Sequence, residues 1–322
     1  MTLRLRDLLA QQGDPLQLES LTGDIGLDRP VPPDAEVASP GLALAGYTGR
    51  FVAKRIHVLG ETEVTYLASL DGAARRKSLD GIFAHDLPVV IITKGQDAPG
   101  ELMELAKAKG VPILRTRHKT AEFYRRIKPI LEEAFAPRTT LHGSLADVYG
   151  VGLLFTGASG IGKSECVLDL VERGHRLVAD DVVLVARKGT DILIGQGHEL
   201  AGHHMEIRGV GLVDVPALFG VRSVRQQKRI EVVVHLEHWE NAKGTDRSGL
   251  QRDTEEILGV AIPKMVVGLN PGKNITVIAE VVAMMHLLRY AGVDVGAQFN
   301  ERLIKRMKEK AGLKDYLRED YE

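Results

Sequence analysis

Apolar and polar positions alternate along the first half of the chain in the order expected of repeated strand and helix units. Residues 87–93 are a short apolar run between turn residues, which predicts a buried strand, and residues 99–109 have helical spacing. A second apolar run at 111–115 and a second helical segment at 120–135 follow, with Pro129 expected to kink the last helix. Because strands that alternate with helices favour a parallel sheet, the region predicts a βαβα unit.

In the second half a similar pattern surrounds a glycine-rich turn. Residues 151–156 predict a short buried strand, and residues 165–173 predict a helix that ends at Gly174. The turn between them has the phosphate-binding pattern GxxxxGKS and consists of Gly157, Ala158, Ser159, Gly160, Ile161, Gly162, Lys163 and Ser164.

The residue types of this turn suit one kind of ligand. Glycines let backbone N–H groups surround phosphate oxygens, and the following helix N-terminus adds partial positive charge. In this pattern Lys163 reaches the β and γ phosphates, and the Ser164 hydroxyl ligates Mg²⁺. We therefore expect the turn to bind a nucleoside triphosphate together with Mg²⁺.

The chain length and a proline-containing break in the helical pattern indicate two domains. The helical pattern of the first half ends at Ala136-Pro137-Arg138, so we expect an N-terminal α/β domain over 1–135 and a catalytic domain over 136–322. A chain of 322 residues has room for two domains of ordinary size, each with its own core.

Charge and cysteine content narrow the partners. Lysine and arginine number 42 against 43 acidic residues, so no global field favours nucleic acid or an anionic membrane. No apolar run reaches the roughly 20 residues of a membrane span, and charges interrupt the N-terminal leucines where a signal peptide would be apolar. The single cysteine, Cys166, cannot form an internal disulfide and is expected to be a packed thiol. We expect a cytoplasmic protein without nucleic-acid or membrane partners.

Two carboxylates follow the next apolar strand. Residues 176–179 predict a strand that ends in Asp180 and Asp181. A carboxylate at a strand end can hold Mg²⁺ or accept a proton from an attacking hydroxyl. An isolated aspartate pair is commonly a solvated turn, but the phosphate-binding turn upstream favours the functional interpretation.

The stretch 205–216, if extended, places Glu206 and Arg208 on one face as a metal ligand beside a phosphate clamp. On its own this pattern is more often a surface ion pair on an edge strand. Arg247 lies in a polar stretch, either as a solvated loop residue or as an arginine that stabilises charge on a transferred phosphoryl group. The turn before an apolar helix at 275–290 is a second anion site or an ordinary helix start.

Together these motifs resemble those of the HPr kinase/phosphorylase family, bifunctional serine kinases that act on the phosphocarrier protein HPr. The resemblance rests on His142-Gly143-Ser144, the phosphate-binding turn through Glu165, Ala179-Asp180-Asp181 and the signature Glu206-Ile207-Arg208-Gly209-Val210-Gly211. It covers essentially the whole chain, although the N-terminal half carries no comparable motif. Pro271-Gly272-Lys273 also fits, but many relatives end this turn in arginine, whose bidentate fork lysine lacks.

The resemblance implies a catalytic domain with a phosphate-loop fold akin to that of phosphoenolpyruvate carboxykinase, behind an N-terminal α/β domain. It implies phosphorylation of an HPr serine by ATP, reversed by phosphorolysis, in which inorganic phosphate attacks phosphoserine and yields pyrophosphate. Family members regulate carbon metabolism and are typically homohexamers. Whether pyrophosphate replaces ATP as the donor stays open.

Roles for single residues follow from the same resemblance. Asp181 would accept the proton of the HPr serine and return it in reverse, Lys163 would bind phosphate, and Ser164 and Glu206 would ligate Mg²⁺. His142 and Arg247 would be catalytic. Residues 205–214 would serve both directions, and residues 268–273 would serve dephosphorylation.

Two other functions remain open from the sequence. One is a small-molecule kinase or a carboxykinase-like enzyme, and the other is a nucleotide-gated regulatory protein. The chain has no Asn-Lys-x-Asp motif for guanine, and its acidic strand follows the phosphate-binding turn sooner than is usual in motor ATPases.

Overall fold

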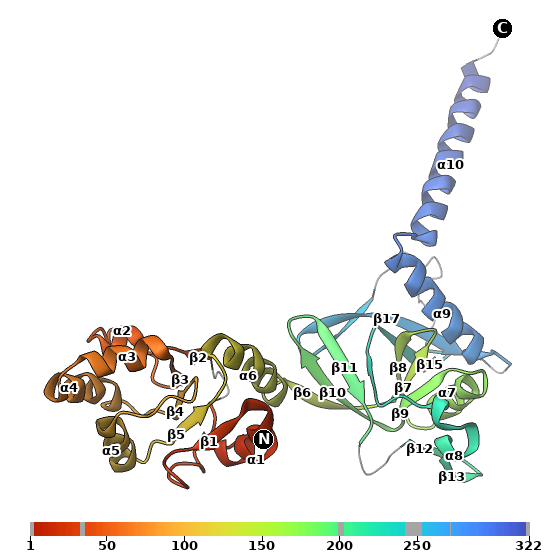
Figure 1. Cartoon of the computed structure of the whole chain (residues 1–322). Coiled ribbons are helices and arrows are strands. Elements are labelled where there is room, and N and C mark those ends of the chain that lie inside the picture. The colour runs from red at the N-terminus through yellow and green to blue at the C-terminus, as the bar shows by residue number, and fades with distance from the viewer. Residues whose placement is uncertain (1–2, 33–35, 199–202, 242–252, 271, 320–322) are drawn as a thin grey trace. The chain divides into compact units, whose positions relative to one another are not determined.

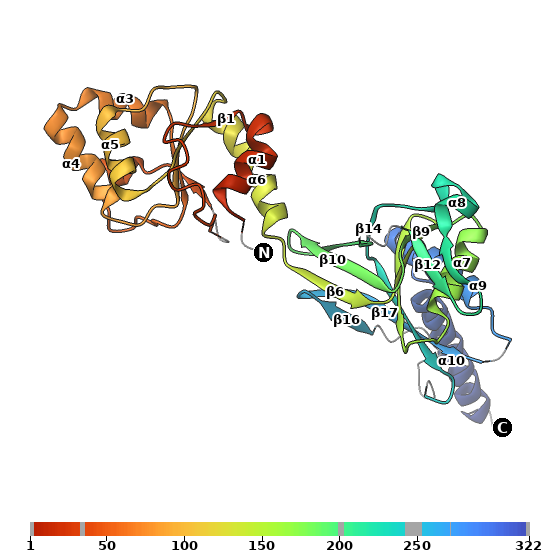
Figure 2. The ribbon, with the colours of Figure 1, turned by 90° about the horizontal axis from the view of Figure 1, so that it is seen from below.

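The computed structural model describes residues 3–32, 36–198, 203–241, 253–270 and 272–319, with side chains described through residue 308. Contacts between Cα atoms divide the chain into two compact units, Met1–Phe135 and Ala136–Glu322. Each unit combines helices with sheet (Figures 1 and 2). The mixed α/β class expected from the sequence is confirmed.

The N-terminal unit is built on a five-stranded sheet in the order β1-β5-β4-β3-β2. The four strands β2 to β5 are parallel, and β1 is antiparallel to β5. The strands are β1 (Leu18–Ser20), β2 (Val37–Ala38), β3 (Ile56–Leu59), β4 (Val89–Ile92) and β5 (Ile113–Thr116). The helices are α1 (Leu5–Leu16), α2 (Gly41–Leu44), α3 (Glu61–Ser69), α4 (Gly72–Phe83), α5 (Gly100–Lys109) and α6 (Thr120–Ala134).

Both faces of this sheet are buried, which explains its unbroken apolar strands. Val90 and Ile92 of β4 belong to a core with α3, α4 and α5, whereas Val89 and Ile91 belong to a second core with α1 and α6. Successive side chains of a strand point to opposite faces, so a strand between two helical layers has no polar face. The predicted βαβα unit is confirmed as β4, α5, β5 and α6, and α6 continues through Pro129.

The second unit contains a six-stranded sheet, a four-stranded sheet and a hairpin. The strand orders are β16-β17-β15-β8-β7-β9, β14-β11-β10-β6 and β12-β13. The strands are β6 (Arg138–His142), β7 (Ser144–Val148), β8 (Val151–Gly157), β9 (Arg176–Ala179), β10 (Val182–Lys188), β11 (Ile192–Gln196), β12 (His204–Ile207), β13 (Gly211–Asp214), β14 (Gln227–Arg229), β15 (Val232–His238), β16 (Thr254–Ile257) and β17 (Val260–Leu269). The helices are α7 (Lys163–Glu172), α8 (Val215–Phe219), the 3-10 helix η1 (Val221–Ser223), α9 (Ile275–Tyr290) and α10 (Val295–Glu319).

Strand β8 lies at the centre of this unit and separates two cores. Leu153 and Phe155 pack with α7 and α9, whereas Leu154 packs with side chains of the four-stranded sheet. Only glycine fits at position 152, because a Cβ there would lie 1.8 Å from the backbone oxygen of Arg229.

The parallel strands of the six-stranded sheet bring their carboxyl ends to one edge. β15 is parallel to both β8 and β17, and β9 has the same direction because β7 is antiparallel to both β8 and β9. The phosphate-binding turn follows β8, the aspartate pair follows β9, and the turn before α9 follows β17. Ligands commonly bind at such an edge of an α/β sheet.

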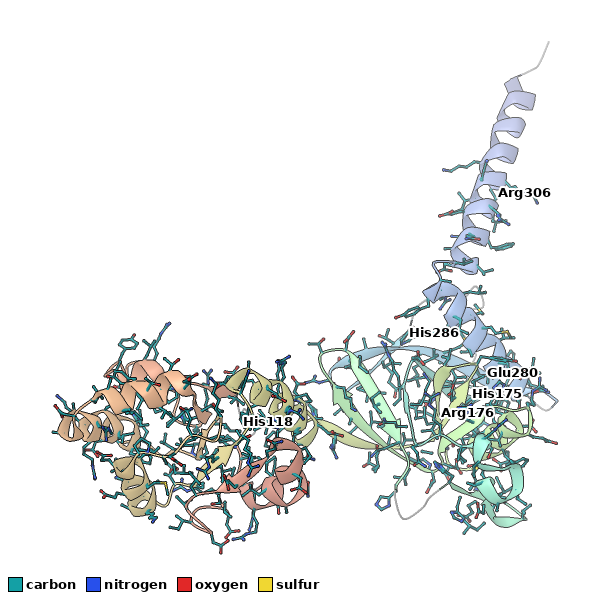
Figure 3. The ribbon with its side chains drawn as sticks, in the orientation of Figure 1. His118, His175, Arg176, Glu280, His286 and Arg306 are labelled. Atoms are coloured by element: carbon teal, nitrogen blue, oxygen red, sulfur yellow. The ribbon has the colours of Figure 1, made fainter. Side chains whose placement is uncertain are left out.

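A buried carboxylate joins α7 to α9. Glu280 Oε1 and Oε2 accept hydrogen bonds from Arg173 at 2.9 and 2.7 Å, and His175 Nε2 lies 3.1 Å from Oε1. Figure 3 labels Glu280 and His175 in this unit. The Glu280 side chain is only 9% exposed. The Arg173 guanidinium holds the pKa of Glu280 below its usual range. Burial acts in the opposite direction, and His175 lowers the pKa further.

The helices differ from typical membrane spans in length or composition when each is taken singly. No single helix within the described residues is long and apolar enough to cross a bilayer. One bent pair, α9 with α10 through Lys308, meets the criteria of length and composition when its two helices are taken together.

Replacing Glu280 is expected to destabilise the second unit. Glu280→Gln removes charge-assisted hydrogen bonds, so we expect a loss of about 2 kcal/mol in the free energy of unfolding at pH 7. Because the pKa of Glu280 is lowered, its stabilisation is present above the ordinary glutamate pKa of about 4.3 and is lost as the pH falls through the lower folded value.

Urea unfolding followed by the fluorescence of Trp239, the single tryptophan, measures this difference. The difference in the free energy of unfolding between the unaltered protein and Glu280→Gln should become smaller at acid pH. The exposed Glu172, at the end of α7, supplies the control Glu172→Gln. Equal midpoints for all three proteins at pH 7 would contradict a stabilising role for Glu280.

Candidate functional site

The phosphate-binding turn has the backbone that its glycines predict. Gly157, Gly160 and Gly162 have φ values of 137°, 73° and 105°, a region that residues with a side chain rarely adopt. Helix α7 begins directly after Gly162. Lys163 is 6% exposed, and its Nζ donates to the backbone oxygens of Gly157 at 3.1 Å and Ala158 at 2.9 Å. The turn, its helix and its lysine therefore form one preorganised cradle for phosphate oxygens.

Asp180 connects this cradle to the neighbouring strand. Its Oδ1 accepts hydrogen bonds from Ser144 Oγ at 2.5 Å and from Ser164 Oγ at 3.0 Å. Burial raises the pKa of the Asp180 carboxyl, although the hydrogen bonds from both serines oppose the shift. Asp180 thereby holds the hydroxyl that the sequence assigns to Mg²⁺.

Asp181 is oriented differently and reaches solvent. Its φ of 63° turns the chain sharply between β9 and β10, and its side chain is 73% exposed. His142 Nδ1 lies 3.0 Å from Asp181 Oδ1 and 3.0 Å from its backbone oxygen. Because both of these oxygens accept hydrogen bonds, Nδ1 carries the proton that points at them. His142 thus fixes a carboxylate that a substrate hydroxyl can approach.

Glu206 and Arg208 lie near the phosphate-binding turn, but not on one extended strand. The condition of an extended 205–216 is not met, because β12 ends at Ile207 and a turn precedes β13. The glycines at 209 and 211, with φ of 81° and 101°, favour this turn. A Cβ on Gly160 would lie 2.4 Å from Arg208 Nη2, so the guanidinium sits directly against the turn.

One pocket of about 240 Å³ collects these groups. It is lined by His142, Ser144, Ser159, Gly160, Gly162, Lys163, Ser164, Glu165, Asp180, Asp181, Glu206 and Arg208. The structure thus brings together all the predicted catalytic and metal-ligating residues that it describes. Arg247 lies outside the described residues.

The oxygen donors of the pocket suit Mg²⁺. No group of three or more His, Cys, Asp or Glu side chains within the described residues forms a metal site by itself. Mg²⁺ typically takes one or two protein oxygens and completes its shell with phosphate and water. The Ser164 hydroxyl, held by Asp180, and the Glu206 carboxylate line the pocket and meet that need.

Two contacts were not foreseen from the sequence. Ser144 reaches Asp180 because β7 pairs with β9 through an irregular register between Leu145 and Ala146, which no local pattern announces. Lys273, after β17, donates to the Gly268 backbone oxygen at 2.8 Å and lies 5.8 Å from the centre of the Trp239 ring. Lys273 and Trp239 are far apart in the sequence, so no local pattern predicts their contact.

Cys166 is a packed thiol, as expected. The residue is 4% exposed, and burial raises the pKa of its thiol to about 12. A thiol with this pKa is almost entirely protonated at neutral pH, so Cys166 is neither a nucleophile nor a metal ligand here.

Comparison with known proteins agrees with the motifs in this pocket. Residues 3–131 match the family model for the HPr Serine kinase N terminus, and residues 133–303 match the model for the HPr Serine kinase C-terminal domain. A solved structure titled as the Hpr(Ser) kinase/phosphatase from Coxiella burnetii is 34% identical, covers 51% of this chain and 99% of that chain, and superposes with a TM-score of 0.46.

Curated relatives are similar over most of their length. A protein named HPr kinase/phosphorylase from Chloroherpeton thalassium is 46% identical over 270 residues, which are 84% of this chain and 79% of the relative. Proteins of the same name from Prosthecochloris aestuarii and Bacillus cereus are 44% and 39% identical, over 90% and 94% of this chain and 87% and 96% of theirs. The chain belongs to the HPr serine kinase family.

Proposed function

We propose that this chain is a bifunctional enzyme that phosphorylates a serine of HPr with ATP and removes the phosphate by phosphorolysis. The observation that carries the proposal is the single pocket that places the phosphate cradle beside an exposed carboxylate. Membership of the family supplies the protein substrate, because its members are named for HPr.

In the forward direction the serine hydroxyl is a weak nucleophile near neutral pH and must lose its proton as the phosphoryl group moves. Asp181 is the acceptor: its carboxylate takes the proton while the serine oxygen bonds to the γ phosphorus and the bond to ADP breaks. His142 orients Asp181 through its Nδ1 proton. Asp180, whose pKa is raised and whose Oδ1 is occupied by two serines, positions Ser164 instead.

Charge on the phosphoryl oxygens has to be offset as the transfer proceeds, which is the main requirement of this reaction class. Lys163 does so from the cradle and Arg208 from the hairpin turn. We assign Arg247 the same task, on the strength of the family resemblance. Ser164 and Glu206 would hold Mg²⁺, which would supply further positive charge to offset the charge of the phosphate oxygens.

The reverse reaction uses the same groups with phosphate as the nucleophile. An oxygen of inorganic phosphate attacks the phosphoserine phosphorus, the bond to the serine oxygen breaks, and Asp181 returns its proton to that oxygen. The products are pyrophosphate and unmodified HPr. Lys273, in the turn after β17, supplies a cation for the attacking phosphate.

We further propose a phosphate-loop fold akin to that of phosphoenolpyruvate carboxykinase for the second unit, a cytoplasmic location and a role in carbon regulation.

We also propose that the protein assembles as a homohexamer. Side chains at helical spacing on two helices support an assembly because they expose apolar surface, which marks interaction sites when it is contiguous. They are Val277, Val281, Met284 and Leu288 of α9 and Val295, Phe299, Leu303 and Met307 of α10, each between 41% and 67% exposed.

One assay tests the reaction in both directions. The protein is incubated with HPr, radiolabelled ATP and Mg²⁺, and inorganic phosphate is added after ATP is removed. We expect label on HPr first, and release of labelled pyrophosphate afterwards. Label on a metabolite but not on HPr would indicate a small-molecule kinase, and no turnover would indicate a regulatory nucleotide-binding protein.

Asp181→Asn is expected to lower the rate of HPr phosphorylation by about 10²–10⁴-fold, because asparagine cannot accept the serine proton. ATP binding should stay nearly intact, since the cradle does not include Asp181. Transfer of label to HPr gives the rate, and calorimetry gives the affinity for ATP. Asp253→Asn, at an exposed position outside the pocket, is the control. Full activity of Asp181→Asn would exclude Asp181 as the base.

Lys273→Met is expected to raise the Michaelis constant for inorganic phosphate about tenfold, since it removes a charged hydrogen-bond donor. The rate of phosphorylation by ATP should change by less than about twofold. Pyrophosphate release at a series of phosphate concentrations measures the effect. Lys273→Arg keeps the charge and should retain the Michaelis constant. An equal loss in both directions would assign Lys273 to the fold rather than to phosphorolysis.

A further inference from the structure

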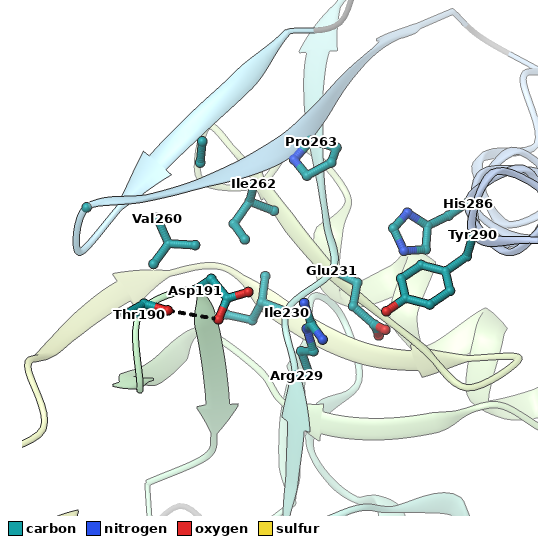
Figure 4. Close-up of a pocket in the computed structure, with 12 residues that line it drawn as sticks. Thr190, Asp191, Arg229, Ile230, Glu231, Val260, Ile262, Pro263, His286 and Tyr290 are labelled. Atoms are coloured by element: carbon teal, nitrogen blue, oxygen red, sulfur yellow. Dashed lines mark hydrogen bonds between the residues drawn. The ribbon is translucent and has the colours of Figure 1, made fainter. Parts of the chain in front are cut away.

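A second pocket, of about 410 Å³, is shown in Figure 4. It lies at the opposite end of the strands that carry the phosphate site. It is formed by the turn between β10 and β11, the residues before β15, the start of β17 and the last turns of α9. The phosphate-binding turn follows the carboxyl end of β8, whereas this pocket borders the amino ends of β15 and β17. The two pockets share no residue.

Charges of both signs face this second pocket: the carboxylate of Glu231 pairs with Lys228, whereas the guanidinium of Arg229 does not pair with a pocket carboxylate within the described residues. The guanidinium of Arg229 and the carboxylates of Asp191 and Glu231 all line the pocket (Figure 4). A partly buried guanidinium that lacks a partner forfeits the charge-assisted hydrogen bonds that usually accompany its burial.

Glu231 is held in place by its neighbours. Its Oε2 accepts hydrogen bonds from Lys228 Nζ and from the Gly152 backbone nitrogen, both at 2.7 Å. Gly152 belongs to β8, and the backbone of Arg229 lies directly against it. This close packing also holds Ile230 and Glu231, the residues that follow Arg229. Such support gives a binding site a fixed geometry before the ligand arrives.

The remaining walls are neutral or apolar. Val260, Ile262 and Pro263 of β17 line one side. His286 and Tyr290 project from α9 towards Glu231 on the other (Figure 4). Burial lowers the pKa of His286, with Glu231 opposing and neighbouring cations assisting, so the ring adds no charge at neutral pH.

We propose that this pocket binds a free aliphatic α-amino acid as its zwitterion. The carboxylate pairs with Arg229, the ammonium group with Asp191 and Glu231, and the side chain packs against Val260 and Ile262. A phosphate ester would meet two carboxylates, and a simple cation would meet Arg229, so a ligand with both charges fits best. The volume lies within the roughly 300–1,000 Å³ of small-molecule sites.

The test uses the full chain and calorimetric titration with L-valine, L-leucine and L-isoleucine. We expect saturable binding of at least one of them. 4-Methylpentanoate, which lacks the ammonium group of leucine, and 3-methylbutylamine, which lacks the carboxylate, should each bind at least about tenfold more weakly. No HPr or phosphoryl transfer enters the measurement, so its outcome is independent of the proposed reaction.

Variants locate the site. Arg229→Gln and Asp191→Asn should each weaken the amino acid about tenfold or more, while Arg222→Gln, an exposed arginine outside the pocket, should change the affinity less than about twofold. ATP binding at the phosphate cradle shows that each variant is folded. Failure of all three amino acids to saturate up to about 20 mM would overturn the proposal. So would undiminished binding to Arg229→Gln, or equal binding of leucine and 4-methylpentanoate.

Discussion

The catalytic unit depends on the burial of β8 between two layers. Its side chains alternate between the core beneath α7 and α9 and the core shared with the four-stranded sheet. Parallel pairing with β15 then directs its last residue, Gly157, to the sheet edge where β9 and β17 also end. Phosphate cradle, carboxylate pair and the turn with Lys273 come from separate stretches of sequence, and all three follow strands that end at this edge of the sheet.

The site divides its two adjacent carboxylates between distinct tasks. Asp180 is buried, accepts hydrogen bonds from two serines and has a raised pKa, whereas Asp181 is exposed and faces His142. A left-handed backbone at Asp181 produces this difference by turning the second side chain away from the first. In the proposed reversible phosphoryl transfer, Asp180 would keep the Ser164 hydroxyl in place while Asp181 would exchange a proton with the substrates.

Much of this arrangement was accessible from local sequence patterns. The glycines of the phosphate-binding turn, the helix at 275–290 and the strand before Asp180 are local features, and the structure has them. The hairpin turn at Arg208 was not predicted, although Gly209 and Gly211 beside it have the positive φ values that a turn requires. The contact of Ser144 with Asp180 and the pocket at Arg229 depend on strand order and register, which a single sequence does not encode locally.

The buried thiol on the helix that follows the phosphate cradle has a use beyond its packing. Cys166 is the only cysteine of the chain, and a thiol with a pKa of about 12 reacts negligibly while it stays buried. Alkylation at this position can proceed only through openings that expose α7 to solvent. Alkylation of Cys166 thus measures how often helix α7 opens, without an added label and without a second thiol that could react.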